Sequence, residues 1–96
     1  MSNIRIDPDT MNARAGEYRQ EADQVGQVIT KMNNLLATLQ TEWEGEASRS
    51  YATRYETDLR PNFQRAQDLI NEIAVALDNT AAQMRERDAF LAASFR

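Results

Sequence analysis

Apolar residues follow a helical rhythm along two long stretches of this chain, with a short interruption near its middle. In both stretches they recur at spacings of mostly three and four residues, which places them on one side of a helix. A repeat this regular is typical of long helices that pack along their length. The upstream series is Met11, Ala15, Tyr18, Ala22, Val25, Ile29, Met32, Leu36, Leu39 and Trp43; the downstream series is Ala52, Tyr55, Leu59, Phe63, Ala66, Ile70, Ile73, Leu77 and Met84. The pattern predicts an all-α fold, an antiparallel helix-turn-helix hairpin.

The first helix has a clear start signal at Asp7-Pro8-Asp9. Asp7 can cap the helix, Pro8 suits its first position, and Asp9 complements the positive end of the helix dipole. We therefore expect the first helix over about residues 8–42. Gly26 lies within it, where the missing side chain favours a close approach to the facing helix rather than a hinge.

A tight turn is expected at residues 43–45, because Gly45 can adopt the positive φ that a chain reversal requires. The second helix should cover about residues 46–90 as one bent helix. Pro61 lacks a backbone N–H and its ring clashes with the preceding turn, so a kink is expected near it. Together these elements form a single domain over residues 1–96.

A second apolar row widens the apolar side of each helix, through Val28 and Leu35 upstream and through Leu69 and Val75 downstream. One neighbouring helix covers only one stripe, so the wider face requires another partner. Pairing two hairpins into a four-helix bundle would cover it. The predicted seam of core and dimer contacts consists of Val25, Val28, Ile29, Met32, Leu35, Leu36, Leu39, Leu59, Phe63, Ile70, Ile73 and Leu77.

Composition matters mainly through the functions it argues against. The formal net charge of −4 leaves no basic surface for phosphates, so we expect neither nucleic-acid binding nor an anionic membrane as the main partner. Histidine and cysteine are both absent, which removes the commonest general base, nucleophilic thiolates and the commonest metal ligands. We expect no enzyme activity, no cofactor and no metal. Residues 1–10 carry no apolar leader region, and no stretch nears the roughly twenty apolar residues of a membrane span, so we expect neither a cleavable leader nor stable membrane insertion.

The residues at the turn have simple structural interpretations as well. Trp43 could plug the gap between the helix ends, and Glu42, Glu44 and Glu46 are more simply a charged tip than a catalytic group. Glycosidase-like carboxylates require a cleft that holds them at a set separation, and a thin hairpin offers none. The tyrosines at positions 18, 51 and 55 are most simply packing residues.

Chain length, the central Trp43-Glu44-Gly45, the long flanking helices, the Asp-Pro start and the early proline of the second helix together form a recognisable pattern. In these features the whole chain resembles the WXG family of small ESAT-like proteins exported by type VII (ESX) secretion systems. The resemblance implies a secreted protein without a cleavable leader, with a cytoplasmic pool before export. It implies recognition of a folded dimer by a membrane-anchored ATPase of the FtsK/SpoIIIE type. A role as adaptor or chaperone for other type VII substrates would also fit.

The resemblance extends to the C-terminal tail, residues 84–96. The family's usual tail signal contains a tyrosine, which this tail lacks. The tail is instead similar to a variant found in the homodimeric, Firmicutes-like branch, and this implies a secretion signal made of Met84, Asp88, Leu91 and Phe95. Continued helix packing is the alternative for Met84. In an antiparallel dimer, the tail of one subunit can lie near the Trp-x-Gly turn of the other.

Two functional hypotheses remain open at this level. The first is a secreted type VII substrate that forms a homodimer, favoured by the self-contained apolar rows and the tyrosine-free tail. The second is a non-secreted cytoplasmic helical scaffold or heterodimer partner.

Overall fold

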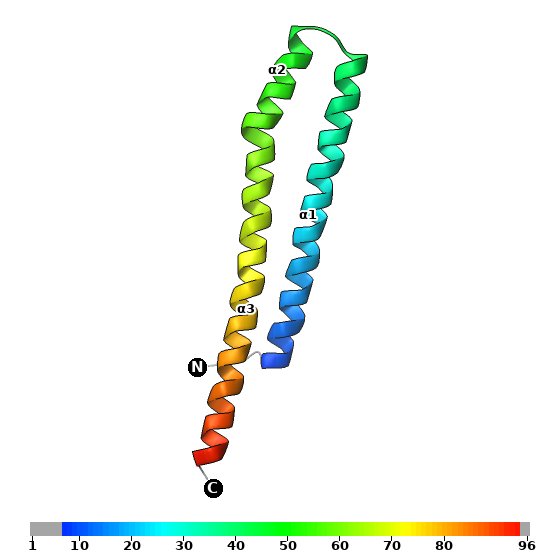
Figure 1. Cartoon of the computed structure of the whole chain (residues 1–96). Helices are drawn as coiled ribbons and strands as arrows, with labels where there is room; N and C mark the ends of the chain where they lie inside the picture. Colours follow the sequence, from blue (N-terminus) through cyan, green and yellow to red (C-terminus); the bar gives the residue numbers. More distant parts are fainter. Residues whose placement is uncertain (1–6, 95–96) are drawn as a thin grey trace, which may run out of the picture.

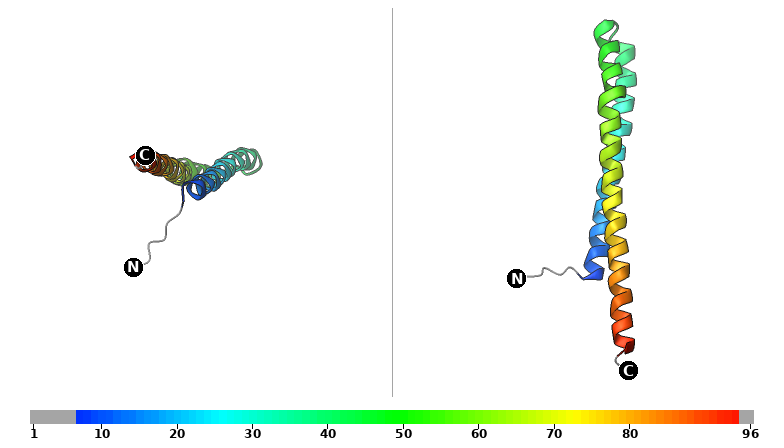
Figure 2. Two further views of the ribbon diagram at one scale, coloured as in Figure 1. Left: turned by 90° about the horizontal axis from the view of Figure 1, so that it is seen from below. Right: turned by 90° about the vertical axis from the view of Figure 1, so that its left-hand side faces the viewer.

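The computed structural model describes residues 7–94, which form a long, thin hairpin of helices (Figure 1). Its principal dimensions are 76 × 23 × 20 Å, with a Cα radius of gyration of 21.4 Å. The two arms run antiparallel and form a single layer two helices wide, as the two views of Figure 2 show. No strand occurs between residues 7 and 94. The predicted all-α hairpin is therefore confirmed.

The first arm is a single helix, α1, over Pro8–Glu42. The Asp7 carboxylate accepts a hydrogen bond from the Thr10 backbone N–H at 2.8 Å, and Pro8 occupies the first turn. This start satisfies one of the free N–H groups of the first turn, where proline costs no hydrogen bond. The helix ends where Trp43 turns to an extended conformation.

The second arm begins with α2 over Glu46–Arg54, continues through a π-helical turn, η1, over Tyr55–Leu59, and ends with α3 over Arg60–Ser94. The Arg60 N–H reaches back five residues to the Tyr55 carbonyl, where an α-helix would reach back four. The arm changes direction at this point (Figure 1). It remains helical to Ser94, beyond the range of about 46–90 expected from the sequence.

The π-turn explains how Pro61 is accommodated within the arm. In a regular α-helix the proline ring would clash with the carbonyl of Thr57, four residues earlier. Thr57 lies within η1, where the wider turn moves the carbonyls out of α-helical positions. The distortion expected near Pro61 therefore takes the form of an inserted residue just before it, which also accounts for the four-four spacing of Tyr55, Leu59 and Phe63.

The contact between the two arms is formed mostly by small side chains. Small residues let two helix backbones approach closely, and the larger apolar side chains then lie to the side of the contact. Most of the contact between the arms lies between α1 and α3. The buried apolar residues are Ala15, Ala22, Ile29, Ala52, Tyr55, Ala74 and Ala81, and Ser48 is buried with them.

This packing corrects the downstream register of the predicted hairpin seam. Ala66 was expected on the seam but is exposed, whereas Ala74 and Ala81, which the pattern passed over, are buried. The predicted seam instead contains the larger residues Ile70 and Leu77. They are half-buried and lie on the row of the helix next to these alanines. Alanines therefore form the contact itself, and the larger residues flank it.

Polar contacts between the arms fix their relative position along the open half of the hairpin. Asp78 of α3 accepts hydrogen bonds from the Asn12 amide and the Arg19 guanidinium of α1, both at 2.6 Å. Farther out, Arg85 pairs with Asp9 at 2.7 Å. These contacts oppose any sliding of one arm past the other, because a shift by one turn would break them all.

Gly26 makes room for a further polar contact between the arms. A Cβ at this position would lie 2.6 Å from the Gln67 amide nitrogen. Gln67 uses the space to donate a hydrogen bond of 3.0 Å to the Ala22 carbonyl. The expected close approach at Gly26 is therefore made by a side chain of α3.

Candidate functional site

Gly45 connects the two arms in a backbone conformation reserved for glycine. Its φ of 132° and ψ of 175° lie in a region that side-chain-bearing residues rarely occupy. A Cβ at this position would have open space around it, with nothing within 4 Å. Glycine is therefore required here by backbone conformation, and not by crowding.

Trp43 is displayed at the hairpin tip. Its backbone N–H donates to the Leu39 carbonyl at 2.7 Å, which closes the last turn of α1. Its ring lies 6.0 Å from the Tyr51 ring, tilted by 33°, so the two arms meet through aromatic side chains. Because 39% of Trp43 stays exposed, a buried plug between the helix ends does not describe it fully. An aromatic surface is available to a partner there.

The charged residues of the tip do not form a compact cluster of ligands. Glu42, Glu44 and Glu46 are all exposed. Within residues 7–94 there is no group of three or more carboxylates placed to hold a metal ion. Nor does any helix in this part of the chain carry an apolar stretch long enough for a bilayer crossing.

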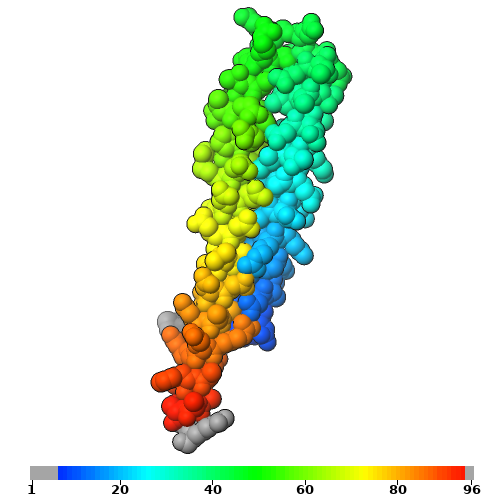
Figure 3. All heavy atoms as spheres, viewed as in Figure 1, coloured from blue at the N-terminus to red at the C-terminus, as the bar shows by residue number. Residues whose placement is uncertain are grey.

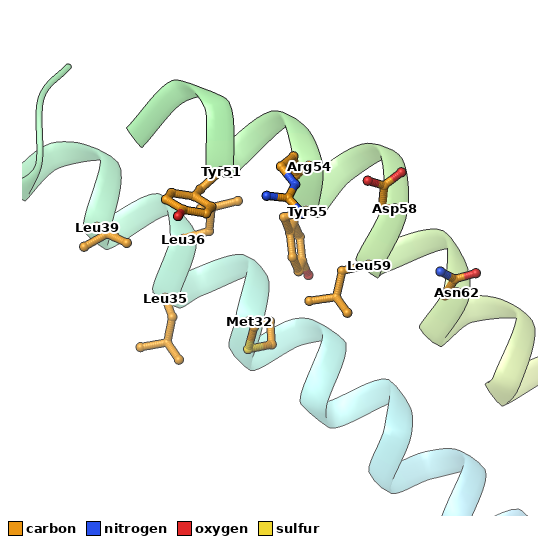
Figure 4. A pocket seen from close by; sticks show the side chains of 10 residues that line it. All are labelled: Met32, Leu35, Leu36, Leu39, Tyr51, Arg54, Tyr55, Asp58, Leu59 and Asn62. Carbon is orange, nitrogen blue, oxygen red and sulfur yellow. The ribbon is translucent and has the colours of Figure 1, made fainter. Parts of the chain in front are cut away.

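An apolar groove lies between the arms just below the tip, and we call it the tip groove (Figure 4). Its volume is about 530 Å³. Met32, Leu35, Leu36 and Leu39 of α1 line one wall, and Tyr51, Arg54, Tyr55, Asp58, Leu59 and Asn62 line the other.

Tyr55 anchors the base of the tip groove. The residue is buried, and its hydroxyl donates to the Asn33 side chain and lies 3.3 Å from the Ile29 carbonyl. Since Tyr55 is also the first residue of the π-turn, this bond ties the irregular turn to α1. The hydroxyl therefore has a structural role that the sequence did not reveal, because a tyrosine on a helical face is most simply read as packing.

Larger apolar residues continue from the tip groove along one side of the hairpin. Ala15, Ala22 and Ile29 are buried between the arms, so the residues three positions after each lie on the next row around α1. On α3, Leu77 and Met84 follow the buried Ala74 and Ala81 by three positions, and they too lie on the next row around the helix. The two arms are antiparallel and face each other. A step of three positions along the chain from the buried residues therefore leads to the same side of the hairpin on both arms.

We call this side the apolar face. Of the predicted seam, only Ile29 is buried among the described residues; the others are half-buried or exposed, and Leu35 is the most exposed at 64%. The hairpin alone therefore leaves most of the predicted seam accessible. The apolar face consists of Met11, Tyr18, Val25, Val28, Met32, Leu35 and Leu39 on α1, and of Leu59, Phe63, Ile70, Ile73, Leu77 and Met84 on the second arm.

The C-terminal end of α3 extends beyond the start of α1 (Figure 3). Since Arg85 pairs with Asp9 in the first turn of α1, residues 86–94 have no α1 beside them. We call this segment the protruding end.

The predicted C-terminal signal falls partly on the protruding end. Met84 is half-buried, and Asp88 and Leu91 are exposed. Phe95 lies outside the described residues. Phe90, which the sequence did not single out, exposes 72% of its surface, the largest exposed fraction among the large apolar residues of the described chain. Its place beside Leu91 in an uncovered stretch of helix could have signalled it.

Two carboxylates have pKa values shifted by their contacts. The Arg19 guanidinium, followed by the Asn12 amide, lowers the pKa of Asp78 below its ordinary value of 3.8. Hydrogen bonds from Thr10 lower the pKa of Asp7 in the same way. Both groups are therefore charged at neutral pH, and they stabilise the open end of the hairpin.

The chain matches known proteins over nearly its whole length. The family model WXG100, described as proteins of 100 residues with WXG, matches residues 3–89. The chain is 31% identical over 93 residues to protein YukE of Bacillus subtilis (strain 168), covering 97% of this chain and 95% of YukE. It is 26% identical over 95 residues to type VII secretion system extracellular protein A of Staphylococcus aureus (strain USA300), covering 99% and 97% of the two chains.

A solved structure supports the same assignment. EsxA of Geobacillus thermodenitrificans superposes with a TM-score of 0.85 at 30% sequence identity, covering 96% of this chain and 98% of that one. The predicted family resemblance is therefore confirmed in both sequence and fold.

Proposed function

Because this chain belongs to the WXG100 family, we propose that it is a substrate of a type VII (ESX) secretion system that leaves the cell as a folded homodimer. The observation that carries this proposal is the match, over 99% of the chain, to a protein named as an extracellular component of that system. In this proposal the protein is extracellular, and a cytoplasmic pool precedes export.

The apolar face supports the homodimer. A one-layer hairpin cannot cover large side chains such as Leu35, Val28 and Leu39, which are all exposed. Contiguous apolar surface of this kind marks an interaction site in proteins that stay in solution. Two copies that bring these faces together form a four-helix bundle with a continuous core. In a symmetric dimer the same face serves both partners, so no foreign chain is needed.

Two features of the structure support recognition by the secretion machinery. The first is the tip, where Trp43 and Gly45 define the turn, and the second is the helical segment that carries Met84, Asp88 and Leu91. In this proposal a FtsK/SpoIIIE-type ATPase reads these residues in the folded dimer and drives export. The protein acts by binding and not as an enzyme, and it accompanies other type VII substrates as an adaptor or chaperone.

Export is tested by measuring the untagged protein in cells and culture supernatant, with and without the secretion ATPase. We expect export only when the ATPase is present. Trp43→Ala and Leu91→Ala should each reduce export by about tenfold or more, as expected when an anchor residue is removed from a recognition surface.

Val75→Ala is the matched control. The sequence placed Val75 in the second apolar row, but in the structure it is exposed among polar residues of α3 and is not part of the apolar face. Retention of the wild-type protein in cells with a working ATPase would contradict secretion and favour the cytoplasmic scaffold. Normal export of both test variants would contradict the assigned signal alone.

A further inference from the structure

We propose that the tip of the hairpin carries a saccharide-binding site, which takes a pyranose ring against Trp43 among polar side chains from both arms. The ligand is a small molecule, and the site needs neither the second copy nor the secretion machinery of the proposed function. Three features of the tip support it: an exposed aromatic ring, polar groups without partners beside it, and a backbone that holds both in place.

An open cavity lies at the tip, and we call it the polar cup. Its volume of about 590 Å³ falls within the range of roughly 300–1,000 Å³ that is usual for small-molecule sites. The last turn of α1, the connection between the arms and the first turn of α2 build it together. Its lining residues are Gln40, Trp43, Glu44, Gly45, Ser48 and Arg49. Trp43 is the only large apolar side chain among them, so the cup suits a polar ligand that has one apolar side.

Trp43 supplies that apolar contact. It lines the polar cup, whereas Tyr51, whose ring lies 6.0 Å away, lines the tip groove. Tyr51 therefore supports the indole from the side of the groove, and 39% of Trp43 stays exposed. The face of an aromatic ring carries partial negative charge, which attracts polarised C–H groups. A pyranose with equatorial hydroxyls presents such C–H groups on its flat sides.

The polar side chains of the cup are not occupied by contacts within the chain. Neither Glu44 nor Arg49 forms an ion pair within residues 7–94. Ser48 is 5% exposed, and its hydroxyl has no hydrogen-bond partner in that part of the chain, where no fully buried side-chain oxygen lacks one. This oxygen is therefore reached from the cup, which Ser48 lines.

These groups fit the neighbouring hydroxyls of a neutral sugar. The Gln40 amide donates and accepts hydrogen bonds, the Arg49 guanidinium donates, and the Glu44 carboxylate accepts. A sugar hydroxyl does both, so one ring can satisfy all three groups. A free phosphate or carboxylate would instead face Glu44, and a cation would face Arg49. The paired charges therefore favour an uncharged ligand.

The backbone fixes the cup before any ligand arrives. The Trp43 N–H donates to the Leu39 carbonyl at 2.7 Å, and the Arg49 N–H donates to the Gly45 carbonyl at 3.2 Å. Between these bonds, Gly45 holds a conformation that other residues rarely adopt. A site formed in advance loses little conformational freedom on binding.

The intrinsic fluorescence of the protein tests the site directly, because Trp43 is the only tryptophan in the chain. Titration of the full-length protein with cellobiose or N,N′-diacetylchitobiose should give a saturable change in emission, with a dissociation constant in the millimolar range that an open site of this kind allows. Sorbitol is the matched ligand control, because it carries similar hydroxyls without a ring. It should give no saturable change.

Variants that keep Trp43 locate the ligand in the cup. Gln40→Ala and Ser48→Ala should each raise the dissociation constant about fivefold, as expected for one lost hydrogen bond. Gln64→Ala and Ser50→Ala are the matched controls, because both residues are exposed and neither lines the cup. Circular dichroism of each variant checks that the hairpin is intact.

Each outcome bears on the site itself. The absence of a saturable change with both disaccharides would overturn it, as would an equal response to sorbitol. Saturable binding that neither cup variant weakens would place the ligand elsewhere and would also overturn it. None of these results depends on export, so they leave the proposed secretion standing.

Two further variants separate the site from the dimer and from the fluorescence signal. Leu35→Glu keeps every residue of the cup and should still bind; loss of binding would show that the second copy is needed and would overturn a site built by one chain. Saturation-transfer NMR observes the sugar protons, so it can be applied to Trp43→Ala. That variant should lose the transfer to the ring C–H groups, and unchanged transfer would contradict stacking on Trp43.

Discussion

Gly45 shows how a single residue determines the connection between the arms. The open space around its Cα would accept a methyl group, yet its φ of 132° disfavours one. The requirement for glycine at this position therefore comes from the backbone conformation, and it does not depend on what packs around the tip. This is the physical basis for glycine in the Trp-x-Gly turn of this chain.

Replacing Gly45 by alanine should destabilise the fold by about 1–3 kcal/mol, the usual cost of a residue held in such a backbone region. The free energy of unfolding can be measured by urea denaturation at one protein concentration. Gly16→Ala is the control: Gly16 lies inside α1 with nothing within 4 Å of its Cβ position, so alanine there should stabilise by roughly 0.5–1 kcal/mol. Equal effects of the two variants would contradict this account.

The contacts of Asp78 with Asn12 and Arg19 lie toward the end of the hairpin away from the turn. They predict that acid lowers the stability of the fold from this end. Its pKa is lower in the folded chain than the ordinary 3.8, so its contribution is complete above about that pH. The contribution is lost as the pH falls through the lower folded value, because protonation weakens the contacts with Arg19 and Asn12. The melting temperature should therefore fall on acidification below about pH 4.

Circular dichroism melts across this range test the prediction. Asp78→Asn should melt lower than wild type at neutral pH and lose less on acidification. Asp7, whose pKa is lowered as well, should leave some dependence in the variant. Asp68→Asn, at an exposed position of α3, serves as control. Identical pH profiles for wild type and Asp78→Asn would refute the role of this carboxylate.

At the scale of the elements, the π-turn is the main departure from regular helix. It lies just before Pro61, relieves the clash that proline would cause, and shifts the side-chain register between α2 and α3. The shift lets Tyr55 point into the contact between the arms while Leu59 borders the tip groove. The irregular turn therefore shapes the wall of the groove.

Tyr55→Phe should weaken the anchoring of this turn without changing the hydrophobic contact. The loss of one hydrogen bond should reduce the free energy of unfolding by about 0.5–1.5 kcal/mol. It should also speed amide hydrogen exchange at residues 55–59. Tyr51→Phe is the control, since Tyr51 is exposed, unlike the buried Tyr55. No effect of Tyr55→Phe on exchange or stability would show that the hydrogen bond is not what holds the turn.

At the scale of the whole molecule, the hairpin buries the contact between its arms and leaves the apolar face accessible. Alanines bring the arms together, which leaves the larger apolar residues beside the contact, on the apolar face. The small residues therefore fix the shape of the hairpin, while the larger residues form an accessible apolar surface. The surface is what the proposed dimer uses.

Leu35→Glu should therefore dissociate the dimer, because it introduces a charge into the apolar face. Sedimentation at micromolar concentration should give a single-copy species for this variant and a two-copy species for wild type. Val75→Glu is a matched control of similar exposure, 51% against 64% for Leu35, at a site surrounded by polar residues. A dimeric Leu35→Glu would argue against the apolar face as the interface.

The sequence by itself determined the helical class, the hairpin and the position of the turn. These follow from local signals: a sustained three-four spacing, a capped start at Asp7-Pro8, and a glycine between two apolar series. The family resemblance follows from the same signals combined with chain length. Local chemistry of this kind acts within a few residues and can be recognised in any sequence that carries it.

Only the tertiary structure decided which row of each helix faces the other arm. The contact selected alanines at 74 and 81 over the larger Ile70 and Leu77, because close approach of two backbones favours small side chains. It also placed the π-turn before Pro61, turned the Tyr55 hydroxyl toward Asn33 and opened the tip groove. These features depend on the separation and register of two distant segments, which no local pattern specifies.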